Sequence, residues 1–112
     1  MYRLIIMCGL VLMLMLTTNA NADDDDWQEI CQGWGTLAEA VMDGRQAGVS
    51  MQDMIDAVIT EDTDSLILDL VIEAYESPRY SVPENQRREI QDFKNKWYLG
   101  CVKVFQAVRR TE

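Results

Sequence analysis

Apolar residues recur at helical spacing in four stretches of the chain, which polar or proline-containing connections separate. In the first stretch, from about Asp25 to Ala47, apolar side chains return every three or four residues and form one stripe. The second stretch begins at Ser50, which opens a capping-box pattern with Asp53, and it ends near Thr60. Both patterns predict amphipathic helices.

The third stretch, from about Asp64 to Ser77, is apolar around most of its circumference. This pattern predicts that it is the most buried helix. A second capping box at Ser81 precedes the fourth stretch, which begins with Pro83 in its first turn and runs to about Val108. No stretch favours a strand, so we expect an all-α fold.

The first 22 residues have the pattern of a signal peptide. Arg3 is their only charge, residues 4–16 are an unbroken apolar run, and Ala20-Asn21-Ala22 supplies the small residues that precede a cleavage site. The run is shorter than the roughly 20 residues that span a bilayer. We expect residues 1–22 to be removed, leaving residues 23–112 as one periplasmic or secreted domain without membrane contact. An uncleaved signal anchor is the alternative.

Two cysteines, Cys31 and Cys101, lie in the expected domain, because Cys8 falls in the signal peptide. An exported chain with an even number of cysteines is typical of a disulfide-bonded protein, and only one internal pairing exists. This pairing requires the first and last helices to run antiparallel. We therefore expect a small disulfide-linked antiparallel bundle of about four helices, in which Gly33, Gly35 and Gly100 allow close helix contact near the disulfide.

The net charge of −9 is unevenly distributed along the chain. Residues 23–76 hold 15 acidic residues and one basic residue, whereas residues 77–112 hold four acidic and eight basic residues. Such an acidic protein is a poor partner for nucleic acid or anionic lipid. The internal explanation, which we favour, is that the basic last helix lies against acidic earlier helices; an external basic docking face is the alternative.

The residues that usually carry catalysis are missing or occupied. The chain has no histidine, which removes the commonest general base and metal ligand. The disulfide uses both thiols, and Ser50 and Ser81 are expected helix caps. Residues 62–64 resemble the start of a calcium loop but lack the glycine and closing glutamate of that motif. We expect no enzymatic activity, no metal site and no cofactor.

One cluster of polar and aromatic residues is a candidate interaction site. In the antiparallel arrangement, the first and third helices end at the same pole, opposite the disulfide. Arginine and tyrosine often anchor protein interfaces, and part of the cluster lies on a loop stiffened by proline. The candidate residues are Arg45, Gln46, Tyr75, Glu76, Arg79 and Tyr80. The alternative is internal: Tyr80 packs under the loop, and the arginines pair with Glu76 or cap helix-end carbonyls.

Three segments carry a resemblance to known proteins: residues 44–49 (GRQAGV), residues 74–80 (AYESPRY) and residues 93–101, from Phe93 to Cys101. With these segments, nearly all of the expected domain resembles a group of small exported helical proteins of Gram-negative bacteria and their phages, which have no assigned function. In size, export, helicity and single disulfide, the protein is also similar to periplasmic acid-stress chaperones, although the cysteine positions differ.

These observations lead to three hypotheses about function. The first is a non-enzymatic exported protein that binds another protein, of unknown identity, through the Arg45/Arg79/Tyr80 pole. The second is a stress chaperone, because protonation of its 19 carboxylates would reverse the charge of the protein and loosen it in acid. The third is a phage-type regulator that keeps residues 1–22 as a membrane anchor.

Overall fold

The computed structural model describes residues 26–111, and these residues form an all-helical fold with four helices. The helices are α2 (Asp26–Ala47), α3 (Met51–Val58), α4 (Ser65–Glu76) and α5 (Pro83–Arg110). The expected signal peptide, its cleavage before Asp23 and Cys8 lie outside the described residues. None of the four described helices is long and apolar enough to cross a membrane.

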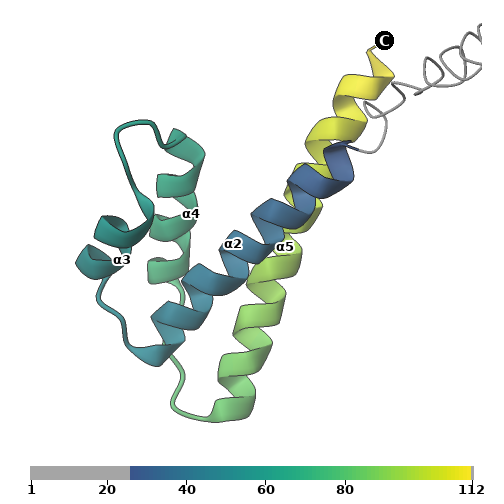
Figure 1. Cartoon of the computed structure of the whole chain (residues 1–112). Helices are drawn as coiled ribbons and strands as arrows, with labels where there is room; N and C mark the ends of the chain where they lie inside the picture. The colour runs from purple at the N-terminus through teal and green to yellow at the C-terminus, as the bar shows by residue number, and fades with distance from the viewer. Residues whose placement is uncertain (1–25, 112) are drawn as a thin grey trace, which may run out of the picture.

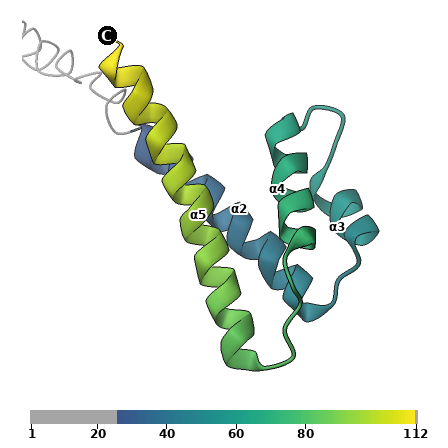
Figure 2. The same cartoon turned by 180° about the vertical axis from the view of Figure 1, so that it is seen from behind.

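The two long helices, α2 and α5, run antiparallel along each other and form an arm (Figure 1). The predicted disulfide between Cys31 and Cys101 joins them near the free end of the arm, with 5.4 Å between the two Cα atoms. The shorter helices α3 and α4 lie on one side of α2, and α4 packs on α2 (Figure 2). The expected disulfide-linked antiparallel bundle of four helices is confirmed, with α2 in contact with each of the other three.

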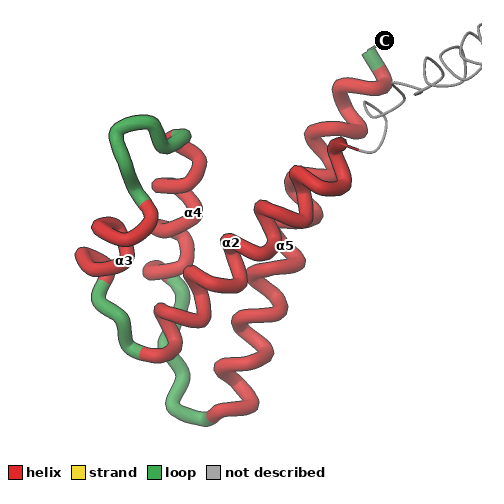
Figure 3. The backbone as a smooth tube through the Cα atoms, viewed as in Figure 1, coloured by secondary structure: helices red, strands yellow, loops and turns green. Residues whose placement is uncertain are grey.

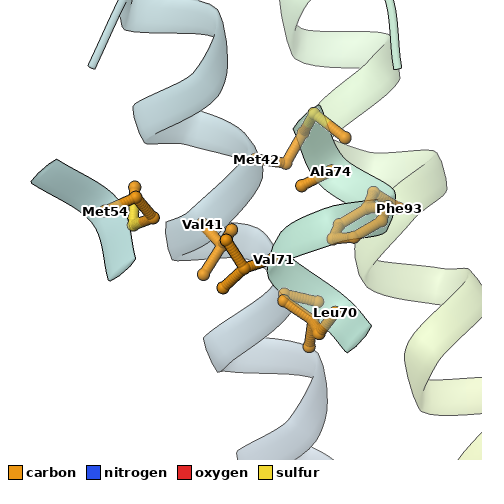
Figure 4. Close-up of a cluster of buried hydrophobic side chains, with 8 residues drawn as sticks. Val41, Met42, Met54, Leu70, Val71, Ala74 and Phe93 are labelled. Atoms are coloured by element: carbon orange, nitrogen blue, oxygen red, sulfur yellow. The ribbon is translucent and has the colours of Figure 1, made fainter. Parts of the chain in front are cut away.

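The hydrophobic core lies where α4 crosses the C-terminal half of α2, away from the disulfide. Figure 4 shows buried side chains from all four helices meeting there. Leu70, Val71 and Ala74 of α4 face Val41 and Met42 of α2, and all five are fully buried. The core is completed by Ala38, Met54 and Phe93. The structure thus divides into a packed base and an arm that extends beyond it.

The helix starts differ in how their backbone N–H groups are satisfied. Ser50 caps α3 as predicted, because its hydroxyl oxygen accepts a hydrogen bond from Asp53 N at 3.1 Å. Asp64 caps α4 through its bond from Leu66 N. The prediction that Ser81 caps the last helix is wrong: Val82 is the cap residue and makes no side-chain hydrogen bond. Pro83 at the first helical position has no N–H to satisfy, so this start needs less capping.

The prediction that the third helix is the most buried element is also wrong. Leu66, Leu68 and Ile72 of α4 are exposed, whereas α2 contributes more fully buried residues than α4. The reason is geometric: α2 and α3 each cover one side of α4, and α5 follows α2 instead of α4. A helix that is apolar around most of its circumference therefore keeps part of its apolar surface uncovered.

Of the three glycines expected to allow close helix contact, one does so. A Cβ atom at Gly35 would lie 3.7 Å from side-chain atoms of Lys94 and Tyr98, so this glycine brings α2 and α5 together. The same expectation is wrong for Gly33 and Gly100, because a Cβ at either position would meet open space. The close approach of the arm helices therefore occurs one turn beyond Cys31.

Two ion pairs join the basic last helix to the acidic helices. Lys94 of α5 pairs with Glu39 of α2, and Lys96 pairs with Glu73 of α4. Part of the charge asymmetry is therefore used inside the fold, as the internal explanation expects.

Candidate functional site

The fold brings the six predicted site residues together at the base of the molecule. The C-terminal ends of α2 and α4 meet there, beside the loop of residues 77–82 that leads into α5 (Figure 3). We call the six residues Arg45, Gln46, Tyr75, Glu76, Arg79 and Tyr80 the pole. The antiparallel arrangement inferred from the sequence is the reason that residues more than 30 positions apart become neighbours.

Gln46 is the centre of the pole. Its side chain is buried, with 3% of its surface exposed. The side-chain Nε2 donates to the carbonyl of Pro78 at 2.9 Å, and the side-chain Oε1 accepts from the backbone N–H of Tyr80 at 2.8 Å. The carboxamide therefore binds the loop as another backbone segment would, and it fixes residues 78–80 against α2.

The two arginines of the pole bind helix-end carbonyls. Arg45 donates through Nε and Nη2 to the carbonyl of Ser77, at 3.4 and 3.3 Å, where α4 has ended. Arg79 donates through Nε to the carbonyl of Gln46, at 3.2 Å, in the last turn of α2. A cation near a helix C-terminus is favoured by the helix dipole, so both contacts stabilise the ends of these helices.

Tyr75 connects α4 to the start of α3. Its hydroxyl donates to the carbonyl of Val49 at 2.7 Å, and the Arg45 guanidinium lies 5.2 Å from its ring centre. Burial raises the pKa of Tyr75 above its ordinary value of 10.0, nearby Asp53 adds to this rise, and Arg45 opposes it. The phenol therefore stays protonated at neutral pH and remains a hydrogen-bond donor.

The contacts of the pole are internal. Gln46, Arg45, Arg79 and Tyr75 all bind backbone carbonyls of this chain, and Glu76 is exposed. This geometry agrees with the internal alternative, in which the arginines cap helix ends. An interaction role for the pole stays a prediction, and the exposed surfaces of Glu76 and Arg79 are where a partner would reach it.

A second feature, which we did not predict from the sequence, is an apolar groove of about 460 Å³ between the arm and the N-terminal end of α4. We call this feature the groove. Eight of its ten lining residues are uncharged, and Asp64 and Lys96 are the two charged ones. Its largest apolar side chains are Ile30, Trp34, Leu66, Trp97, Val104 and Phe105.

Large apolar side chains are exposed in this groove. Ile30 is 47% exposed, Leu66 is 48% exposed and Val104 is 62% exposed. In addition, the indole N–H of Trp97 is buried and finds no acceptor within residues 26–111. A buried N–H without a partner costs roughly 1–3 kcal/mol. The exposed apolar side chains are typical of a binding surface.

The sequence held one signal for the groove, in the lengths of the helices. The arm helices α2 and α5 have 22 and 28 residues, whereas α3 and α4 have 8 and 12. At 1.5 Å per residue, α5 is about 42 Å long and α4 about 18 Å, so the short helices cannot cover the apolar stripe of the arm. Periodicity alone does not tell which part of an apolar stripe finds a partner.

The described residues offer no alternative based on metal chemistry, because no group of three or more histidine, cysteine, aspartate or glutamate residues among them could hold an ion. No family model matches the chain, and neither a curated protein nor a solved structure was found to be similar to it.

Proposed function

We propose that this protein is an exported, non-enzymatic protein that acts by protein–protein interaction, and that the groove is its contact surface. The observation that carries the proposal is the groove itself, an apolar surface formed by three helices whose side chains are exposed. Exposed apolar patches of this kind mark interaction sites on small proteins. The occupant for which we argue in the following subsection is a second copy of the chain.

The chemistry of the remaining residues supports a non-enzymatic role. The sequence contains no histidine, and Cys31 and Cys101 are joined to each other. The hydroxyl of Ser50 accepts the capping hydrogen bond of α3, and the polar side chains of the pole bind backbone groups. A nucleophile with an adjacent base, which covalent catalysis requires, is not formed within residues 26–111.

Site-specific photo-crosslinking in the producing cell tests this proposal. A photoreactive residue replaces Val104 in the groove, and a control carries it at Leu99, which is 52% exposed on the same helix but does not line the groove. We expect one discrete adduct from position 104 and none from position 99. An additional Ile30→Glu substitution should abolish the adduct, because it puts a charge on the opposite wall of the groove. Equal labelling at both positions would contradict the proposal.

The same experiment compares the groove with the pole. The substitutions Arg79→Ala and Tyr80→Ala remove both side chains but keep the backbone N–H of residue 80 that binds Gln46. If the groove is the contact surface, the adduct from position 104 persists in this double variant. Loss of the adduct with retained helicity would indicate that the pole, and not the groove, is the contact surface.

A chaperone role is the second candidate, and the inter-helix ion pairs favour it. Glu39 and Glu73 pair with Lys94 and Lys96, which ties α5 to both α2 and α4. Of the two, the pair of Lys96 with Glu73 joins α4 to the arm, and its loss at low pH would loosen α4 beside the groove. The chaperone hypothesis expects increased binding of a hydrophobic dye at pH 2 to 3 with helicity retained. An unchanged dye signal would count against it.

A further inference from the structure

We propose that the groove is filled by α4 of a second copy of this chain, so that two α4 helices lie side by side between two arms. This inference rests on the proposed function, because it names the occupant of the same groove. It follows from three features of the described residues: the uncovered surface of α4, the position of the groove beside it, and the charges on the two facing helices.

The uncovered surface of α4 is the first feature. Leu66, Leu68 and Ile72 are large and apolar, yet they are exposed on α4, which is apolar around most of its circumference. Exposed apolar side chains that gather on a small protein are typical of an interaction surface. Because α2 and α3 are the helices that cover α4 in one copy, these side chains remain available for a further contact.

The second feature is the position of the groove, which lies beside α4 and along α5. Gly100, Val104 and Phe105 of α5 form one wall of the groove, and Leu66 of α4 forms another. A Cβ atom at Gly100 would meet nothing within 4 Å, so the backbone of α5 is open to close approach at this point. In one copy α4 packs on α2 but hardly on α5, and a second α4 placed over α5 would fill the equivalent position.

The charges on the two helices are the third feature. All charged residues of α4 and the preceding loop are acidic: Glu61, Asp62, Asp64, Asp69, Glu73 and Glu76. On α5, Lys96, Lys103 and Arg110 are spaced by seven residues and share one edge of the helix. Lys96 already pairs with an α4 carboxylate of its own copy, whereas Lys103 has no ion-pair partner within residues 26–111. An acidic α4 from a second copy would complement this edge.

One symmetry operation pairs both surfaces at once. Each copy has a helix with exposed apolar and acidic side chains, and an apolar groove that lies beside the basic edge of α5. A two-fold axis that runs alongside α4 places the α4 of each copy over the α5 of the other, which is the self-complementary contact of a symmetric dimer.

Sedimentation equilibrium of the exported, oxidised protein is the direct test. We expect the mass of a dimer, with dissociation into single chains on dilution between about 500 and about 1 µM, the range of ordinary reversible dimers. The mass of a single chain throughout this range would overturn the inference. The mass of a trimer or larger assembly would also overturn it, because the proposed contact closes with two copies.

Three variants locate the contact. Leu66→Glu and Val104→Glu each place a carboxylate in the proposed interface and should raise the dissociation constant by about 100-fold or more. Both positions are exposed in the single chain, and a glutamate at position 66 lies in the first turn of α4, where negative charge is tolerated, so the fold should survive. Val82→Glu is the matched control: Val82 is 51% exposed at the start of α5, does not line the groove, and its substitution should leave the dissociation constant unchanged. Equal effects of all three would overturn the inference.

Carbodiimide crosslinking checks which helices meet. Copies labelled with ¹⁵N are mixed with unlabelled copies, allowed to exchange, and crosslinked between carboxylates and lysines. We expect mixed-isotope crosslinks between residues 61–76 and Lys103. Crosslinks that join peptides of the same isotope alone would overturn the contact.

The photo-crosslinking described above separates this inference from the proposed function. An adduct at position 104 with twice the mass of the chain supports both. An adduct with a different protein overturns the second copy as the occupant but retains an interaction role for the groove. The absence of any adduct contradicts both.

Discussion

The carboxamide of Gln46 and the backbone N–H of Tyr80 are joined by a hydrogen bond of 2.8 Å, although 34 positions separate them in the chain. Gln46 also binds the carbonyl of Pro78, so one buried side chain fixes the loop that leads from α4 into α5. The path of the chain from α4 into α5 therefore depends on a polar group inside the base of the molecule.

We predict that Gln46→Leu destabilises the protein by about 1–3 kcal/mol, because it removes the partners of the part-buried N–H of Tyr80 and carbonyl of Pro78. Urea unfolding monitored by circular dichroism measures this change. The control is Gln32→Leu, at an exposed position of the same helix, which should stay within about 0.5 kcal/mol of the parent. A loss of equal size in both variants would show that the loop contacts of Gln46 contribute little.

The two glycines Gly48 and Gly33 should respond to alanine in opposite directions. Gly48 has a φ of +93°, and a Cβ atom there would lie 2.7 Å from Nη2 of Arg79. Gly48→Ala should therefore destabilise by about 1–2 kcal/mol or more. Gly33 is exposed within α2 and has open space around it, so Gly33→Ala should stabilise by about 1 kcal/mol. Thermal unfolding of both variants decides; changes of the same sign would contradict this account.

Replacing both disulfide cysteines by alanine should lower the free energy of unfolding by about 4 kcal/mol, the chain-entropy value for a sequence separation of 70 residues. The loss of local stability should differ along the chain, because the core lies at the base and the disulfide lies near the free end of the arm. Hydrogen exchange should become faster first in residues 26–33 and 101–111. A uniform increase that includes the core residues of α4 would show that the arm and the base unfold together.

Stability should fall in alkali with a contribution from Tyr75. Burial raises the pKa of Tyr75 in the folded state above 10.0, so the unfolded chain loses this proton first. The contribution is complete below about pH 10 and is lost as the pH rises through the higher folded-state pKa. In Tyr75→Phe, urea midpoints between pH 8 and 11 should fall less steeply than in the parent. The variant should also be about 0.5–1.5 kcal/mol less stable at pH 7, because it lacks the bond to Val49. If the urea midpoints of the parent and of Tyr75→Phe fell equally steeply with pH, Tyr75 would not contribute to the loss of stability in alkali.

Local signals in the sequence predicted the elements well, because each depends on neighbouring residues. The cap at Ser50 and the end of α4 before Pro78 follow from short-range geometry. The disulfide followed from the number of cysteines, and it then fixed the antiparallel order that brought Gln46 near Tyr80. This antiparallel order brings the residues of the predicted pole together, although their side chains bind backbone groups of the same chain.

What the sequence did not predict depends on how far helices extend past one another. Val104 and Phe93 belong to the same apolar stripe of α5, yet Phe93 is buried in the core and Val104 is exposed. The two side chains differ in exposure because α4 lies along only part of the arm. Ser81 does not cap α5 for a different, local reason. Pro83 already makes the start of α5 less dependent on side-chain hydrogen bonds.

The place of the disulfide has a consequence for the timing of assembly. Cys101 is itself part of the groove, and its bond to Cys31 holds the two arm helices together at the point where α3 and α4 give no support. If α4 of a second copy fills the groove, as we propose, the bond between Cys31 and Cys101 should form before two copies pair, because it fixes the two helices that line the groove.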